Sequence, residues 1–146
     1  MNPSPLIYLA GPGIFRKDAE QYGAELKRQC RAFGFWGFWP GDIDVKGLTP
    51  IQAAHTIRQG CINMILRCNA VIADISPFRG IHMDTGTADE CGRADMIGKP
   101  IFAWSDDRRE LADRTLGHFF PTDNGQVSDY AKQNGFTDYS NKNPIR

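Results

Sequence analysis

Four short apolar segments alternate with three longer segments of helical periodicity, and this alternation limits the possible folds more than any other feature of the chain. The apolar segments predict strands at Leu6–Ala10, Phe35–Trp39, Ala70–Ile75 and Pro100–Trp104. The periodic segments predict helices at Lys17–Phe33, Thr49–Cys68 and Thr87–Ile97. Strands that alternate with helices in this way predict an α/β domain with a parallel sheet and right-handed crossovers.

Apolar stripes and end signals support the first two predicted helices. In the first helix, the stripe consists of Ala19, Tyr22, Leu26, Cys30 and Phe33, and Gly34 is a suitable C-terminal stop. The second helix starts at Thr49-Pro50, a hydroxyl cap followed by proline at the first helical position. Its residues expected to face the core are Ile51, Ala54, Ile57, Cys61, Ile65 and Cys68.

The length and composition predict one ordinary globular domain over residues 1–146. Beyond Ser105 the patterns weaken: a helix over Arg108–Leu116 is the next expectation, and residues 130–146 are expected to form an irregular C-terminal tail. Lys plus Arg (17) equals Asp plus Glu (17), so no electrostatic footprint predicts binding to nucleic acid or to an anionic membrane. The N-terminal sequence lacks a basic leader, and no apolar stretch is long enough to span a bilayer.

The four cysteines predict a reduced, cytoplasmic protein. Cys30, Cys61, Cys68 and Cys91 show no CxxC spacing, and three of them fall among the core positions of predicted helices. Together with the histidines they form no pair at a familiar zinc-ligand spacing, so we expect no metal site.

The glycine-rich loop after the first strand has two interpretations. Gly11-Pro12-Gly13 can be a plain tight turn, or a turn that lets the backbone approach a small ligand. A dinucleotide site is not indicated, because Arg16 replaces the third glycine of the fingerprint and Pro12 removes a backbone donor.

A second glycine-rich segment, from Asp74 to Gly92, contains four carboxylates. In an open parallel sheet the carboxyl ends of the strands meet at one edge, so this segment and the first loop are expected to converge there. Each carboxylate also has a structural interpretation: Asp74 can satisfy a turn, Asp84 can cap the next helix, and Glu90 can complement the helix dipole. Asp89 lies about 100° around the helix from Glu90 and is expected to be solvated.

Crowded carboxylates at such an edge are typical of glycosidic bond cleavage, in which one carboxylate attacks the anomeric carbon and an acid protonates the leaving group. A helix dipole that keeps Glu90 ionised would suit the attacking role. The aromatic residues near the edge, each of which could instead belong to the core, could stack on a flat leaving group such as a nucleobase: Tyr8, Phe15, Trp39 and Phe78.

Three motifs in this order resemble the nucleoside 2-deoxyribosyltransferases over about residues 6–105. They are Tyr8-Leu9-Ala10-Gly11-Pro12, Ala73-Asp74-Ile75, and the more specific run from Asp84 to Ala94 with the pattern Asp-x-Gly-Thr-Ala-x-Glu-x-Gly-x-Ala. The resemblance implies a flavodoxin-like (Rossmann-like), doubly wound parallel sheet in a single domain. It also implies exchange of the nucleobase on a 2-deoxyribose, with retention and without a cofactor.

The resemblance also implies site residues. Glu90 matches the nucleophile, Asp74 the carboxylate that passes a proton to and from the base, Asp84 the residue that holds sugar hydroxyls, and Tyr8 the tyrosine that orients the nucleophile. The residues expected to contact the substrate are Gly11, Pro12, Phe15, Gly86 and Asn143. Asn143 would serve a neighbouring subunit, but Asn143-Pro144-Ile145 matches the family pattern imperfectly and the sequence stops directly after it.

The substrates implied are 2-deoxynucleosides and free nucleobases, and the assembly implied is a homo-oligomer with shared sites. Two alternatives stay open: a 2-deoxynucleoside 5-monophosphate N-glycosidase, which would use water as acceptor, and a nucleotide-sensing module without catalysis. Apart from Arg16, the first loop has few groups that could donate hydrogen bonds to a phosphate, and this disfavours the monophosphate N-glycosidase. The crowded carboxylates disfavour the sensing module, because a protein that only binds nucleotides gains nothing from them.

Overall fold

The computed structural model describes residues 4–111 and 114 of the chain. Its strands are β1 (Leu6–Ala10), β2 (Trp36–Phe38), β3 (Ala70–Asp74) and β4 (Ile101–Trp104). Its helices are α1 (Ala19–Ala32), α2 (Pro50–Arg67) and α3 (Thr85–Met96), with short 3-10 helices η1 (Pro12–Phe15) and η2 (Pro40–Asp42). The predicted order of strands and helices is therefore confirmed, with ends that differ by at most two residues.

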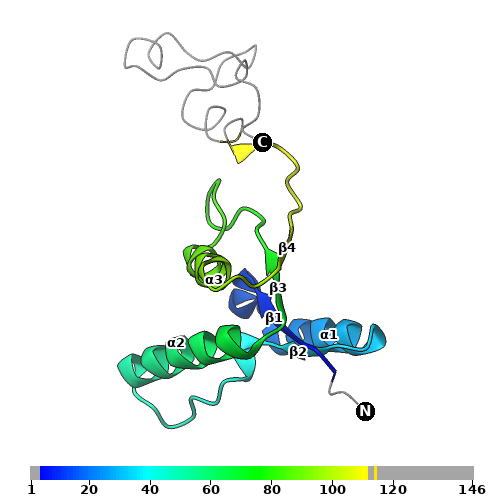
Figure 1. The fold of residues 1–146 in the computed structure, drawn as a ribbon. Helices are drawn as coiled ribbons and strands as arrows, with labels where there is room; N and C mark the ends of the chain where they lie inside the picture. Colours follow the sequence, from blue (N-terminus) through cyan, green and yellow to red (C-terminus); the bar gives the residue numbers. More distant parts are fainter. Residues whose placement is uncertain (1–3, 112–113, 115–146) are drawn as a thin grey trace.

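The four strands form one parallel sheet in the order β2-β1-β3-β4. The chain moves outward from β1 to β2 and then crosses back to β3, so the crossover helices lie on opposite faces. Figure 1 shows α1 on one side of the sheet and α2 and α3 on the other. The doubly wound, flavodoxin-like α/β fold is confirmed, and β1 lies in the interior of the sheet next to β3.

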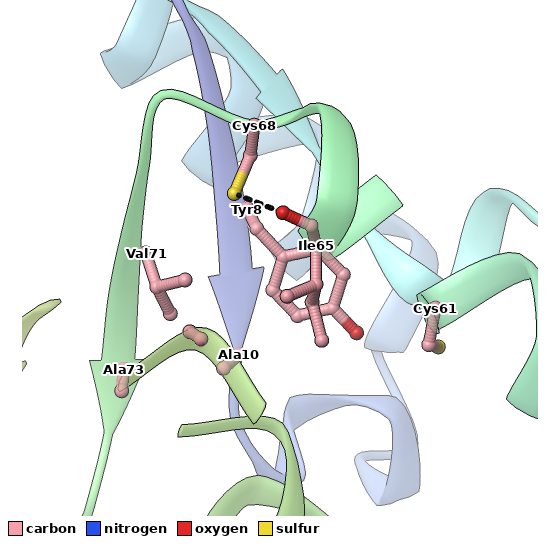
Figure 2. Packing of buried hydrophobic residues seen from close by; sticks show 8 residues of the cluster. Tyr8, Ala10, Cys61, Ile65, Cys68, Val71 and Ala73 are labelled. Atoms are coloured by element: carbon pink, nitrogen blue, oxygen red, sulfur yellow. Dashed lines mark hydrogen bonds between the residues drawn. The ribbon is translucent and has the colours of Figure 1, made fainter. Parts of the chain in front are cut away.

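Alternate residues of β1 contribute to two separate cores, because successive side chains of a strand point to opposite faces. Ile7 and Leu9 pack with Cys30 of α1 and with Trp39. Tyr8 and Ala10 pack on the other face, where the buried cluster also includes Cys61, Ile65, Cys68, Val71, Ala73 and Ala94. Figure 2 shows the Tyr8 ring projecting from β1 toward Ile65 and Cys61 of α2.

The ends of the helices follow from local chemistry. At the start of α2, Thr49 and Gln52 form a reciprocal capping box, and Pro50 occupies the first turn. Helix α1 ends before Gly34, whose φ of 82° favours glycine. Helix α3 begins at Thr85, two residues earlier than predicted, because the Asp84 side chain accepts a hydrogen bond from the Thr87 backbone N–H.

Three residues predicted to face the core are exposed. Phe33 is 80% exposed and Ile51 is 84% exposed, because each lies at a helix terminus, beyond the turns that pack on the sheet. Ala54 is also exposed and lines a cavity instead. The inner positions of the same stripes, Cys30, Cys61 and Ile65, are buried as predicted.

Part of the predicted C-terminal region lies outside the described residues. Leu111 and Arg114 are helical, within the helix predicted at Arg108–Leu116. Asn143 and the predicted tail over residues 130–146 fall outside the part that is described. Within residues 4–111 and 114, no helix combines the length and apolar character needed to cross a membrane.

Candidate active site

A short hydrogen bond joins the interior strand β1 to helix α3. The hydroxyl of Tyr8 donates to Oε1 of Glu90 over 2.6 Å. The Tyr8 ring is fully buried and stacks on Phe38 of β2, with ring centroids 5.6 Å apart. Because the ring is fixed by the core, its hydroxyl holds one oxygen of the Glu90 carboxylate in a defined position.

Glu90 is largely buried but keeps access to a cavity. Burial raises the pKa of the Glu90 carboxyl from 4.5 to about 7, and the charges of Asp84 and Asp89 act in the same direction. The hydrogen bond from Tyr8 opposes this increase. Burial and the charge of Glu90 in turn raise the pKa of Tyr8, so its hydroxyl stays protonated and remains a donor.

The helix dipole is therefore not the dominant influence on Glu90, contrary to the sequence-based expectation. Because α3 starts at Thr85, Glu90 lies in its second turn, where the dipole acts weakly. On the inward face of the helix, Thr87 and Ala94 are buried, whereas Ile97 caps the C-terminus and is exposed.

Asp84 is the N-cap of α3, so its structural interpretation is correct. Its Oδ2 accepts hydrogen bonds from the Thr87 backbone N–H at 2.9 Å and from the Thr87 hydroxyl at 3.2 Å. Asp84 also lines the cavity that contains Glu90. Asp84 can therefore cap α3 and still contact a ligand in the cavity.

Asp74 ends β3 and stabilises the turn that follows. Its Oδ1 accepts a hydrogen bond from the Ser76 backbone N–H at 3.0 Å. Gly11 lies directly against it: a Cβ on Gly11 would be 2.8 Å from the Cβ of Asp74. The φ of Gly11 is 151°, which also favours glycine, so the close approach of the first loop to β3 requires this residue.

The cavity next to Glu90 has a volume of about 440 Å³ and lies at the carboxyl edge of the sheet. One wall is apolar and comes from α2, with Ala54, Ile57, Cys61 and Ile62. The opposite wall is polar and comes from α3, with Asp84, Gly86, Asp89 and Glu90. Gly11 and Phe15 of the first loop close a third side.

A second hollow of about 330 Å³ lies beside the first and contains Asp74. Pro12, Tyr22, Phe78 and Trp104 also line it. Phe15 lines both hollows, so they adjoin at this ring. Asp84 and Glu90 line one cavity and Asp74 lines its neighbour, with residues of the Gly11–Phe15 loop lining both. That the three carboxylates act in one site stays a prediction.

The aromatic residues at this edge divide into core and site. Tyr8 and Trp39 are buried core residues, although the Tyr8 hydroxyl reaches Glu90. Phe15 and Phe78 stack with ring centroids 5.2 Å apart, and the Arg79 guanidinium lies within about 5 Å of both centroids. The Phe15 ring is half exposed and is available to a ligand.

The chain is similar in sequence and fold to known proteins. A sequence model of a family described as nucleoside 2-deoxyribosyltransferase matches residues 7–142. The chain belongs to the nucleoside 2-deoxyribosyltransferase family. An uncharacterized protein of Schizosaccharomyces pombe is 34% identical over 118 residues, which cover 78% of this chain and 56% of that protein. The chain thus spans little more than half the length of this relative.

Two solved structures share the nucleoside 2-deoxyribosyltransferase fold. A 2-desoxiribosyltransferase from Leishmania mexicana is 29% identical, with a TM-score of 0.64 over 92% of this chain and 88% of the other. A 2-deoxyribosyltransferase from the bacterium Bacillus psychrosaccharolyticus is 21% identical, with a TM-score of 0.61 over 75% of this chain and 81% of the other. The second likeness concerns the fold alone.

Several residues that line this family member's cavity were not predicted as site residues, among them Cys61, Arg58 and Arg93. Cys61 was expected to be a core residue, and helical periodicity placed it on the correct face without revealing its neighbours. Arg58 and Arg93 bring positive charge to the rim, where Arg93 pairs with Asp89 at 2.7 Å. Asp89 is exposed, as predicted, although it also lines the cavity.

All four cysteines are free thiols. Cys30, Cys61 and Cys68 are buried, as the sequence predicted, and Cys91 is partly buried. Among residues 4–111 and 114, no group of three or more His, Cys, Asp or Glu side chains is arranged to hold a metal ion.

Proposed function

We propose that this protein transfers 2-deoxyribose between nucleobases through a covalent deoxyribosyl-Glu90 intermediate. The observation that carries the proposal is the 2.6 Å hydrogen bond from Tyr8 to Glu90 at the wall of an open cavity. A carboxylate whose orientation is fixed, and which is largely desolvated, has the properties of a nucleophile for an anomeric carbon. Family membership supports the same reaction class.

In the first half of the proposed reaction, the bond between the anomeric carbon and the base nitrogen breaks as a Glu90 oxygen bonds to that carbon. The electron pair of the broken bond stays on the base, which takes up a proton supplied through Asp74. In the second half, another base loses its proton to Asp74 and attacks the same carbon from the face that the first base left. The Glu90 ester breaks, the carboxylate is restored, and the configuration is retained.

The protonation states of Glu90 and Tyr8 suit this mechanism. A pKa of about 7 leaves a substantial fraction of Glu90 ionised at neutral pH, and only the ionised form can attack. Burial makes the charged carboxylate costly, and ester formation removes that charge. The raised pKa of Tyr8 keeps its hydroxyl a donor throughout the cycle.

The two adjoining hollows support separate positions for sugar and base. The sugar would occupy the cavity of Glu90 and Asp84, with an Asp84 oxygen accepting from a sugar hydroxyl. The base would occupy the hollow of Asp74, where Phe15 and Phe78 offer aromatic surface for stacking. The glycosidic bond would then cross from one hollow to the other beside Phe15, with Gly11, Pro12 and Gly86 lining the path.

The start of α3 and the first loop favour nucleosides over the 5-monophosphates of the alternative hydrolase. A helix N-terminus binds phosphate through free backbone N–H groups, but Asp84 already accepts from Thr87 at the start of α3. The Asp84 charge would also repel a phosphate. Arg16, the cation of the first loop, pairs with Asp18 at 2.8 Å.

The same proposal includes a homo-oligomer in which Asn143 of one subunit completes the site of another. Large apolar side chains that would otherwise face water support association: Phe33, Phe35, Trp36, Phe102 and Trp104 are exposed. The four free thiols support the cytoplasmic location inferred from the cysteine pattern. Light scattering coupled to size-exclusion chromatography tests the assembly, and a strictly monomeric, fully active protein would contradict it.

A mixed-base assay tests the function. The purified protein is incubated with thymidine or 2-deoxyinosine as donor and adenine or cytosine as acceptor, and products are separated by chromatography. A new deoxynucleoside that is absent with the Glu90→Ala variant supports base exchange. Free deoxyribose as the sole product would indicate a hydrolase, and binding without turnover would indicate a sensing module.

A further inference from the structure

Arg79 lies against both aromatic rings that line the hollow proposed for the base. The rings of Phe15 and Phe78 stack with centroids 5.2 Å apart and an interplanar angle of 22°. The guanidinium carbon of Arg79 is 5.1 Å from the centroid of Phe15 and 4.8 Å from that of Phe78. Both distances are within the range of cation–π attraction, so one cation contacts both members of the stack.

The stack joins two loops that are distant in sequence. Phe15 belongs to η1, which follows β1, and Phe78 belongs to the loop that follows β3. Both rings line the hollow of Asp74, and Phe15 also lines the cavity of Glu90. Arg79 lines neither of these two spaces, so it supports the rings from outside the volume that a base would occupy.

The backbone of Arg79 is in the left-handed region, with a φ of 52°. Among the described residues other than glycine, Arg79 alone has a positive φ. The backbone N–H of Phe78 donates to the carbonyl of His82 over 2.8 Å, which closes the turn that contains Arg79. Glycine would adopt this φ without strain, so the presence of arginine indicates a role for its side chain.

Two other arginines beside the hollows are paired with carboxylates. Arg16 pairs with Asp18 at 2.8 Å, and Arg93 pairs with Asp89 at 2.7 Å. In the part of the chain that the structure describes, the Arg79 side chain has no such ion pair and no hydrogen bond. Its contacts with the two rings therefore account for the position of the guanidinium.

We propose that Arg79 is a positioning residue for the base: its guanidinium holds Phe15 and Phe78 in their stacked arrangement and so keeps an aromatic surface in place at the hollow of Asp74. Arg79 acts through the rings and touches no reacting atom, so it affects KM for a base more than kcat. Its effect on base exchange rests on the proposed function, whereas its contact with the two rings does not.

The test compares Arg79→Met, Arg79→Gly and Arg79→Lys with Arg31→Met as matched control. Arg31 also lies over an aromatic ring, 5.1 Å from the centroid of Trp36, but Trp36 lines neither of the two hollows. Methionine keeps much of the side-chain length without the charge, and glycine also relieves the backbone strain. Lysine keeps the charge but lacks the planar guanidinium that stacks on rings.

Base-exchange kinetics with a varied concentration of acceptor base give the first readout. Arg79→Met and Arg79→Gly should raise KM for the base by roughly three- to tenfold, with kcat within about twofold of wild type. Arg79→Lys should recover part of the loss, and Arg31→Met should match wild type. A wild-type KM in both Arg79→Met and Arg79→Gly, or an equal rise in Arg31→Met, would overturn the proposal.

Urea unfolding separates this role from a general loss of stability. Arg79→Gly should be more stable than Arg79→Met, because a φ of 52° suits glycine, yet the two variants should show a similar rise in KM. A KM that returns to the wild-type value in the more stable glycine variant would overturn the proposal. The glycine variant also provides the test if Arg79→Met fails to fold.

NMR of protein with ¹³C-labelled phenylalanine gives a readout that needs no turnover. Phe15→Leu and Phe78→Leu assign the ring signals, which ring currents shift while the rings are stacked. Arg79→Met and Arg79→Gly should move the signals of both rings toward unstacked values, and Arg31→Met should leave them unchanged. Unchanged ring signals in both Arg79 variants would overturn the proposal. If wild-type protein exchanges no bases, the proposed function fails, and these spectra still decide whether Arg79 holds the stack.

Discussion

The Tyr8 hydroxyl lies 2.6 Å from Glu90 Oε1, although the two residues are 82 positions apart in sequence. One comes from the interior strand β1 and the other from α3, so the pair links the rigid centre of the fold to its carboxyl edge. Whatever moves α3 relative to the sheet must break or stretch this bond, which makes it a sensitive indicator of an intact site.

Removing the Tyr8 hydroxyl should weaken the reaction without unfolding the protein. In Tyr8→Phe the ring can still stack on Phe38, but Glu90 loses its strong donor. The hydroxyl lowers the pKa of Glu90, so its loss raises that pKa further and leaves less carboxylate ionised at pH 7. We expect kcat to fall by roughly 10²-fold and its acid limb to move to higher pH. A variant with wild-type kcat and an unmoved limb would contradict the role assigned to Tyr8.

Asp84→Asn should shift the pH profile in the opposite direction. The Asp84 charge raises the pKa of Glu90, so a neutral side chain lowers that pKa and moves the acid limb of kcat to lower pH. Asparagine is also a good N-cap, so α3 should keep its start and the free energy of unfolding should change by less than about 1 kcal/mol. The comparison variant is Asp84→Ala, which loses both charge and cap. Identical unfolding curves for the two variants would argue against the cap.

The Gly11 position should tolerate no side chain. In Gly11→Ala the new Cβ would meet the Cβ of Asp74 at 2.8 Å and adopt an unfavourable φ of 151°. Gly80 is the matched control, because its φ is 157° and a Cβ there meets nothing within 4 Å. By urea unfolding we expect Gly11→Ala to lose about 1–3 kcal/mol more than Gly80→Ala. Equal losses would show that conformation, and not the contact with Asp74, decides this position.

Glu90 should cost the protein stability at neutral and alkaline pH. Its pKa is about 7 when folded and ordinarily 4.5, so the folded state holds its proton more tightly than the unfolded state. The stability that this gives is fully present below pH 4.5 and is lost as the pH rises through 7. Glu90→Gln has no titrating carboxyl at this position, so it should be more stable than wild type above pH 7. The difference in free energy of unfolding between the variant and wild type should increase by up to roughly 3 kcal/mol from pH 4.5 to above pH 7. Thermal unfolding of both proteins at pH 5 and pH 8 measures the difference. A difference in thermal stability between the two proteins that does not increase from pH 5 to pH 8 would contradict the burial of a titrating Glu90.

The short apolar segments and the helical stripes were sufficient to predict the strands and helices. The same patterns could not show where a helix extends past the sheet, so Phe33 and Ile51 were wrongly assigned to the core. Helix propensity also could not locate the start of α3, because that boundary depends on the hydrogen bond between the Asp84 side chain and the Thr87 N–H.

Candidate site residues could be named from the sequence, but which of them line the same cavity could not. Tyr8, Asp84 and Glu90 do come together, while Asp74 lies in an adjoining hollow, and residues of the Gly11–Phe15 loop line both spaces. Periodicity placed Cys61 on the buried face of α2 but could not show that it lines the same cavity as Glu90 of α3, because the two residues are distant in sequence.

The covalent intermediate is the central claim, and one mass measurement tests it most directly. The protein is incubated with a 2-fluoro analogue of a 2-deoxynucleoside, which slows breakdown of the glycosyl ester, and is then digested and analysed by mass spectrometry. We predict a stoichiometric sugar adduct on the peptide containing Glu90, carried by Glu90 itself and absent from Glu90→Gln. An adduct on any other residue, or base exchange by the Glu90→Gln variant at the wild-type rate, would contradict the account.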